Sequence, residues 1–247
     1  NTYRLPEQHE LFGDNSFIVA NYDLEPEESK NINLGYTFTQ KKFGFEINSY
    51  YRNTKGLIRL KDLNQYQAMH LNLDNVRGIG VELQAKYEPV DQLYLSGNLT
   101  WNDFRLRSSR DPYLNNQHFR NARVANMPFY YGNLSVAYNL QEIFKLSTDL
   151  SFFWDYSYVH QYYLDYIEKQ FEPDGFLGLF GNSKINTSRI IPNQHTHNIG
   201  FIYVRDFDKQ SVSFSAELKN AFNEEIYNEF KMQSAGRHFR AKITYSF

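Results

Sequence analysis

The sequence predicts an all-β protein, an antiparallel transmembrane β-barrel, from three observations. Apolar and polar residues alternate with period two through most of the 247 residues, whereas the period of amphipathic helices is scarce. The alternating segments run to about ten residues, enough to cross a bilayer at a tilt, while strands of globular proteins average about five or six. Short and long connections alternate between these segments, as do the short turns and long loops at the two ends of a membrane barrel.

The first four strands are predicted at 29–39, 43–52, 79–87 and 93–102. In the first of them, Ile32 and Leu34 share one face while Asn33 lies on the other. The apolar faces of the four carry Ile32, Leu34, Tyr36 and Phe38; Phe43, Phe45, Ile47 and Tyr51; Ile79, Val81, Leu83, Ala85 and Tyr87; and Leu93, Leu95, Leu99 and Trp101. Short polar turns join the members of each pair, and a looser segment at 61–74 separates the two pairs.

Five further strands are predicted at 130–138, 146–158, 199–203, 212–218 and 239–247. Their apolar faces carry Tyr130, Leu134, Val136 and Tyr138; Leu146, Leu150, Phe152, Trp154, Tyr156 and Tyr158; Ile199, Phe201 and Tyr203; Val212, Phe214, Ala216 and Leu218; and Phe239, Ala241, Ile243, Tyr245 and Phe247. The long connections are polar segments at about 107–127, 161–193 and 220–236. All nine strands belong to one predicted domain, because no composition shift or linker divides 1–247.

The aromatic residues, 17% of the chain, gather at the ends of the predicted strands. One group lies toward the short turns and consists of Phe38, Phe43, Phe45, Tyr87, Tyr138, Phe144, Phe201, Tyr203, Tyr245 and Phe247. A second lies toward the long loops and consists of Trp101, Tyr130, Trp154, Tyr156 and Phe239. Two bands of amphipathic rings are what the two interfaces of a membrane select. We therefore expect the apolar faces to contact lipid.

Composition excludes several classes of function. A net charge of −2 gives no general case for nucleic-acid binding, so no nucleic-acid partner is expected. The chain has no cysteine, which excludes disulfides and thiol catalysis. No apolar run is long enough for a membrane helix, and the polar first residues do not resemble a signal peptide. No compact nucleophile–base spacing appears, so we expect no enzyme, no catalytic residue and no cofactor.

Nine strands pose a problem, because bacterial single-chain barrels have even numbers of strands and an open sheet edge cannot face lipid. Residues 1–4 have the pattern of the last part of a preceding strand. The chain is therefore interpreted as the C-terminal part of a larger barrel.

Four segments resemble motifs of the TonB-dependent outer-membrane receptors. They are Tyr3-Arg4-Leu5-Pro6 with Glu10-Leu11 and Asn21-Tyr22-Asp23-Leu24-Glu25-Pro26-Glu27; Asn75 to Glu82; Lys219-Asn220-Ala221-Phe222-Asn223 to Tyr227; and Ala235-Gly236-Arg237 to Phe247. Each motif is weak alone, but their order and spacing along the whole chain are similar to those of that family.

This resemblance implies a 22-stranded barrel of which the chain supplies about nine C-terminal strands. It implies an N-terminal plug domain, the remaining barrel strands, the TonB complex, outer-membrane lipid and the barrel assembly machinery as partners. The function implied is import of a scarce nutrient across the bacterial outer membrane with energy from TonB. An iron–siderophore or haem comes first by family prevalence, and vitamin B12 or an oligosaccharide remains open.

Polar residues opposite the apolar faces are candidates for a hydrated lumen and a plug-docking wall. We single out Glu46, Asn48, Glu82, Asp149, Glu217 and Arg240. A plug that must move needs hydrogen bonds rather than a dry apolar seal, although most of these residues would suit a generic solvated lumen equally well. In the last strand, Tyr245 and Phe247 resemble the signal that the barrel assembly machinery reads.

The loop at 161–193 is rich in aromatic residues. Aromatic rings with converging polar groups suit a siderophore, haem or glycan. The candidate ligand-binding residues are Tyr162, Tyr163, Tyr166, Phe171 and Phe176. Packing of one loop against another explains the same residues equally well, and both interpretations stay open.

Three histidines raise the possibility of a metal site. His195 and His197 lie on one side of a strand, and His160 lies at the other end of the same long loop. However, His197 is in phase with Ile199 and Phe201 on the apolar face. We therefore expect the histidines at the outer rim of the barrel and predict no metal site.

Two other architectures fit parts of the pattern. A small closed barrel acting as an adhesin, passive pore or surface hydrolase would need residues 1–20 to supply a tenth strand, which Pro6 and the turn signal Asp14-Asn15 make awkward. A soluble β-sandwich would leave the alternation of short and long connections unexplained.

Overall fold

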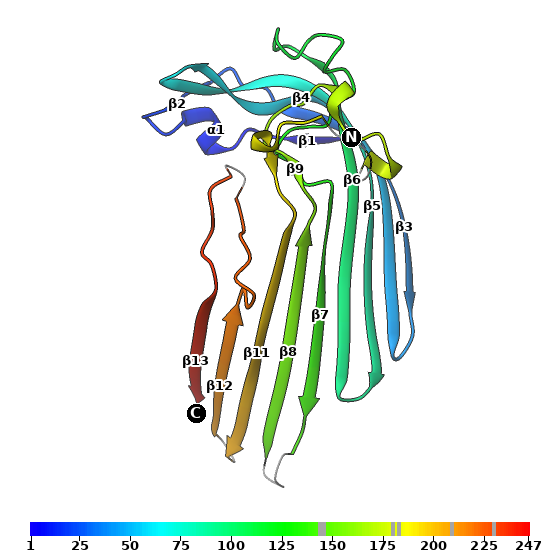
Figure 1. Ribbon diagram of the computed structural model, residues 1–247, viewed down its shortest axis with the longest axis vertical. Helices are drawn as coiled ribbons and strands as arrows, with labels where there is room; N and C mark the ends of the chain where they lie inside the picture. Colours follow the sequence, from blue (N-terminus) through cyan, green and yellow to red (C-terminus); the bar gives the residue numbers. More distant parts are fainter. Residues whose placement is uncertain (143–146, 179–180, 182–183, 208–209, 229–230) are drawn as a thin grey trace.

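The structure is a tall, curved antiparallel sheet with its loops folded over one end (Figure 1). This computed structural model describes residues 1–142, 147–178, 181, 184–207, 210–228 and 231–247. The long strands are β3 (Glu27–Thr39), β4 (Phe43–Asn64), β5 (Gln67–Val90), β6 (Leu93–Ser109), β7 (Tyr130–Leu140), β8 (Thr148–Val159), β11 (Gln194–Phe207), β12 (Gln210–Lys219) and β13 (His238–Ser246). They follow one another in chain order across the sheet, so the predicted all-β antiparallel architecture is confirmed.

Short elements complete the described chain. They are β1 (Thr2–Arg4), α1 (Gln8–Phe12), β2 (Ile18–Val19), β9 (Tyr162–Tyr163), η2 (Lys169–Phe171), η3 (Phe176–Gly178), η4 (Thr187–Arg189) and β10 (Ile190–Ile191). As the sequence suggested, β1 pairs with β3. The rest of 1–20 forms α1 and β2 rather than a tenth long strand. None of the described helices is long and apolar enough to span a membrane.

The sheet is open. Among the described residues, the sheet order begins with β1 on β3 and ends at β13, and β3 does not pair with β13. These nine long strands therefore make a wall and not a closed barrel, which agrees with the interpretation of the chain as part of a larger one.

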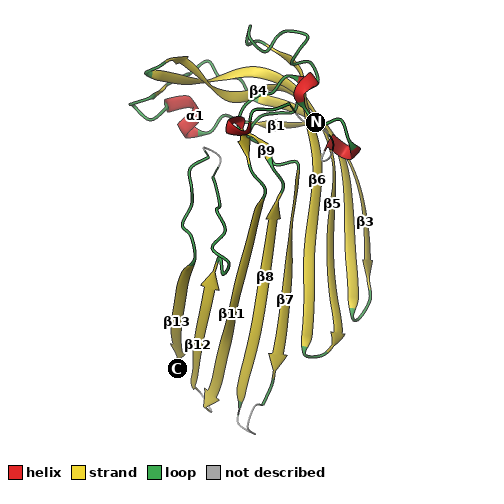
Figure 2. Cartoon of the chain, viewed as in Figure 1, coloured by secondary structure: helices red, strands yellow, loops and turns green. Residues whose placement is uncertain are grey.

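Short and long connections lie at opposite ends of the sheet, as predicted, except that β4 and β5 are joined by a tight turn between Asn64 and Gln67 at the far end of a long hairpin (Figure 2). At one end, tight turns join β3 to β4 and β5 to β6; this is called the short-turn end. The other is called the long-loop end. Leu146 and Phe144, assigned above to a strand and to an aromatic band, lie outside the described residues.

The segment at 61–74, expected to be loose, is instead strand. β4 and β5 continue past the sheet as a hairpin extension that pairs as far as Asn64 and Gln67, and it runs across the top of Figure 1 in cyan. The pairing register shifts between Thr54 and Leu57, beside Gly56 at φ +65°. A bulge inserts a residue into one strand and so breaks the period-two pattern. That break explains why the sequence did not predict these strands.

Pairing register gives the sheet one polar and one apolar face. Glu46 pairs with Gln84, which pairs with Asn98, whereas Leu83 pairs with Leu99 on the opposite face. Large apolar side chains on that second face are open to the surroundings; Leu34 is 76% exposed. A continuous apolar surface of this kind is suited to lipid rather than to water.

The buried core lies at the long-loop end rather than behind the sheet. One cluster joins Val76 of β5 and Leu106 of β6 to Leu114, Phe119 and Tyr166 from two loops. A second cluster consists of Phe129, Tyr162 and Ile191. The loops thus fold into a packed body, and we call residues 110–129 and 160–193 the loop platform.

Candidate functional site

The loop platform is attached to the hairpin extension through a buried carboxylate. Asp74 of β5 is fully buried and accepts hydrogen bonds from Ser109 Oγ at 2.5 Å and from the Tyr166 hydroxyl at 3.0 Å. Its ion pair with Arg59 Nε of β4 measures 3.0 Å. Burial, and then the Asp74 charge, raise the pKa of Tyr166 far above its usual value. Tyr166 therefore stays protonated and serves as a fixed donor.

Asp111 joins a second part of the platform to the same extension. Its carboxylate pairs with Arg59 at 3.2 Å and with Lys61 at 3.2 Å. Burial alone would raise the pKa of Asp111, but the backbone N–H of Tyr113 and the Lys61 ammonium outweigh it and lower that pKa. The loop that begins at Asp111 is thus anchored by charge.

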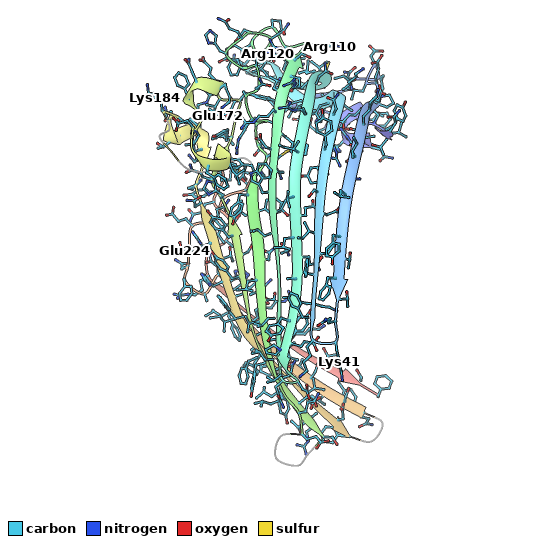
Figure 3. The ribbon with its side chains drawn as sticks, turned by 90° about the vertical axis from the view of Figure 1, so that its right-hand side faces the viewer. Lys41, Arg110, Arg120, Glu172, Lys184 and Glu224 are labelled. Carbon is cyan, nitrogen blue, oxygen red and sulfur yellow. The ribbon has the colours of Figure 1, made fainter. Side chains whose placement is uncertain are left out.

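A second charged cluster connects the two halves of the platform. Glu172 pairs with Arg105 of β6 and accepts a hydrogen bond from the backbone N–H of Arg123 at 2.7 Å. The Arg123 guanidinium lies 3.7 Å from the centre of the Phe129 ring. Burial, followed by the Glu172 charge, raises the pKa of Tyr163 to about 12. Figure 3 shows Glu172 at the long-loop end, far from Lys41 at the short-turn end.

The five aromatic residues predicted to bind ligand have different environments. Tyr162, Tyr163 and Tyr166 are buried at 6%, 3% and 1% exposure, Phe171 is half-buried, and Phe176 is 74% exposed. Packing of loop against loop explains the burial of the three tyrosines. Their role in ligand binding stays a prediction, and Phe176 presents the largest free surface of the five.

A cavity of about 410 Å³ lies beneath the platform, in the size range of small-molecule sites. Ser157 of β8 and Thr196 of β11, which pair with each other, supply its wall from the polar face of the sheet. Tyr162, Gln194 and Tyr227 also line it, and Gln194 Oε1 accepts a hydrogen bond from the backbone N–H of Tyr227 at 2.8 Å. Tyr162 is therefore the predicted ligand residue that reaches a cavity. Sequence patterns could not find this site, because its wall combines residues far apart in the chain.

The six residues predicted to face the lumen share the polar face but form no single cluster. Asn48 pairs with Glu82, and Glu46 lies one pleat further along β4. Glu217 pairs with Arg240 on the other side of the sheet, with β6, β7, β8 and β11 between the two groups. Asp149 lies near the short-turn end, where it accepts a weak hydrogen bond from the Glu142 backbone at 3.4 Å.

The three histidines at 160, 195 and 197 lie among aromatic rings toward the long-loop end. His195 and His197 pair with Tyr158 and Tyr156 on the apolar face, in phase with Ile199 as the alternation predicted. The Nδ1 atom of each ring is hydrogen-bonded to an aromatic neighbour. The Tyr156 hydroxyl lies 2.8 Å from His195 Nδ1, and the Tyr158 hydroxyl lies 2.8 Å from His160 Nδ1. The Trp154 indole N–H donates to His197 Nδ1 at 3.2 Å. A different group, His9, Glu10 and His70, has the spacing of metal ligands among the described residues, and the sequence pattern did not suggest it.

Comparison with known proteins shows which family and which solved structures this architecture resembles. Residues 1–227 match the family model "TonB dependent receptor-like, beta-barrel". The ferric preacinetobactin receptor BauA of Acinetobacter baumannii superimposes with a TM-score of 0.64 at 15% identity, over 90% of this chain and 30% of that one. The copper transporter OprC gives 0.65 at 16% identity, over 98% and 35%. The FrpB iron transporter of Neisseria meningitidis gives 0.58 at 16% identity, over 92% and 31%.

The chain therefore spans about a third of the length of these solved structures. At such identities the likeness establishes the fold alone. No curated protein matches the chain.

Proposed function

The chain belongs to the TonB dependent receptor-like β-barrel family, and from this premise we propose that it forms part of an outer-membrane receptor that imports a scarce nutrient with energy supplied through TonB. The family match over residues 1–227 carries the proposal. The cargo we put first is an iron–siderophore or haem, with vitamin B12 or an oligosaccharide next. The names of BauA and FrpB, a ferric siderophore receptor and an iron transporter, support this order.

The two faces of the sheet fit the two environments that such a receptor needs. The apolar face would contact outer-membrane lipid, and the polar face would line a hydrated lumen occupied by a plug domain. Glu46, Asn48 and Glu82 on one side, and Glu217 with Arg240 on the other, would offer the plug exchangeable hydrogen bonds. No residue is assigned covalent chemistry.

The long-loop end would be extracellular and would capture the ligand. The cavity under the loop platform opens on the polar face, so a nutrient bound there would already lie on the route inward. The last strand ends with Tyr245 and Phe247, which are 54% and 95% exposed on or beside the apolar face. We assign them to recognition by the barrel assembly machinery during insertion.

Uptake by cells tests the proposal. A strain lacking the gene should fail to take up one of a panel of labelled ferric siderophores and haem, and the gene should restore uptake only when TonB is present. The native protein, extracted in detergent, should migrate differently on a gel before and after heating and should exceed the mass of this chain. Uptake that is unchanged without TonB, or a heat-shifted barrel of the mass of this chain alone, would overturn the proposal.

A variant that fills the cavity tests where the ligand binds. Ser157→Phe places a ring in the cavity and should weaken binding of the transported ligand at least tenfold, about 1.4 kcal/mol or more. Ser151→Phe is the matched control, because Ser151 lies on the same face of β8 toward the short-turn end and does not line the cavity. Isothermal titration of both variants in detergent measures the two affinities. Equal loss of affinity in the two variants would place the ligand elsewhere.

A further inference from the structure

The first residues of the chain are fixed against the hairpin extension. Arg4 pairs with Glu10 of α1 at 2.9 Å and with Glu27 of β3 at 2.6 Å. β2 pairs in parallel with β5, through Ile18 and Ala68. These contacts hold α1 beside β5, on rigid elements rather than on a free loop.

Three side chains with metal-binding atoms meet at this junction. His9 and Glu10 come from α1 and His70 from β5, and one nitrogen or carboxylate oxygen from each lies within 4.8 Å of the others. The rings of His9 and His70 meet edge to face with their centres 5.6 Å apart. Glu10 and His70 are buried at 7% and 9% exposure, whereas His9 is exposed.

His70 has an unexplained buried nitrogen. Among the described residues its Nδ1 is buried and has no hydrogen-bond partner. Leaving such an atom unpaired costs about 1–3 kcal/mol, and buried polar atoms in native proteins are nearly always satisfied. A group that binds at this junction would account for the cost.

The charges around the three residues favour a cation. Arg4 supplies one positive charge, against the carboxylates of Glu7, Glu10 and Glu27; Glu7 Oε2 lies 3.4 Å from His9 Nδ1. Glu10 Oε2 accepts from Arg4 at 2.9 Å and from the Glu7 backbone N–H at 2.7 Å, whereas Oε1 accepts from Arg4 at 3.1 Å and has a second lone pair for a metal. The surroundings of the site are therefore net negative.

Two imidazoles and one carboxylate are a donor set for first-row divalent transition metals, and they suit zinc with water as the fourth ligand. Tetrahedral zinc with bonds of about 2.05 Å holds its ligands about 3.3 Å apart. The three atoms, which lie within 4.8 Å of one another, would have to close by at most about 1.5 Å. His9, being exposed on a short helix, can supply that movement by changing rotamer.

We propose that His9, Glu10 and His70 bind one divalent transition-metal ion, and that the ion fastens α1 to β5. This site is separate from the proposed import route, because none of the three residues lines the cavity under the loop platform. It does not depend on the identity of the imported nutrient.

Titration of the metal-stripped protein in detergent with Zn²⁺ alone tests the site. We expect one zinc ion bound per chain at micromolar or lower concentration. His9→Gln should weaken that binding at least tenfold, and His70→Asn should abolish it. His118→Gln is the matched control, since His118 is an exposed histidine with a single carboxylate neighbour, Glu168 at 3.9 Å, and it should bind zinc as the wild type does.

The exposed position of His9 keeps the test decisive even if His70→Asn fails to fold. Ser157→Phe should keep its zinc, which separates this site from any metal cargo in the cavity. The proposal is overturned if the wild type binds no zinc, or if His9→Gln and His118→Gln bind it equally well. A protein that binds zinc as expected but supports no TonB-dependent uptake would count against the proposed function and leave this site standing.

Discussion

Buried charges hold the long-loop end together residue by residue. Asp74, Asp111 and Glu172 each contact an arginine, and each joins segments distant in the sequence. Breaking such a pair on one side is costly, because the partner charge is left in a poorly solvated place. We therefore expect these residues to stabilise the folded loop platform.

The substitution Asp74→Asn tests whether buried charges stabilise the loop platform. The substitution keeps the size of the side chain but removes the charge that Arg59 Nε and the Tyr166 hydroxyl contact. Arg59 keeps Asp111, so we expect the free energy of opening the platform to fall by about 2–3 kcal/mol, somewhat less than for a fully orphaned charge. Hydrogen exchange of the backbone amides in 161–193 measures this free energy of opening.

Asp91→Asn provides the comparison. Its side chain is 90% exposed at the short-turn end and pairs with Lys42 at 3.3 Å. Exchange in 161–193 should not change in this variant. Equal exchange in the Asp74 and Asp91 variants would show that the buried pair does not hold the platform.

At the scale of elements, close approach between strands depends on glycines of two kinds. A Cβ on Gly132 of β7 would lie 2.5 Å from the backbone oxygen of Asn98 on β6. A Cβ on Gly80 of β5 would lie 2.4 Å from the ring of Tyr50 on β4. A backbone atom within a ladder cannot give way, whereas an aromatic ring can rotate aside.

Alanine at these two positions should therefore differ in effect. We expect Gly132→Ala to cost about 2 kcal/mol of unfolding free energy and Gly80→Ala less than about 1 kcal/mol. The temperature at which the folded, faster-migrating gel band disappears ranks the two proteins. A larger loss in the Gly80 variant would mean that the Tyr50 ring is fixed more firmly than the strand pairing.

At the scale of the whole molecule, the sheet has one apolar and one polar face, which suit different surroundings. Its apolar face is continuous from Leu83 through Leu99 and on through Leu134 and Tyr156, while its polar face carries Gln84, Asn98 and Asn133 on the same strands. An exposed apolar face of this kind suits lipid, and the polar face suits water.

Neighbouring residues on β7 separate the two environments. Leu134→Arg should destabilise the inserted protein by about 2–4 kcal/mol if Leu134 lies near the middle of the bilayer. Asn133→Arg, one residue earlier and on the polar face, should cost much less because a charge on that face would not enter lipid. Urea unfolding in lipid vesicles measures both free energies, and equal costs would contradict the assignment of the faces.

Sequence periodicity predicted what depends on near neighbours along the chain. A strand must present every second residue to one face, so the alternation predicted the nine strands, the two faces and the phase of His197. It also predicted the sorting of short and long connections, except between β4 and β5. The polar residues from Glu46 to Arg240 shared a face for the same reason.

The tertiary structure alone decided what depends on contacts between distant residues. The bulge near Gly56 hid the hairpin extension, because one inserted residue reverses the pattern of faces. Only the folded loops bring Tyr166 to Asp74, place Ser157 beside Thr196 under the platform, and set His9 next to His70. Loop closure of this kind depends on packing and charge at long range, which leave no period in the sequence.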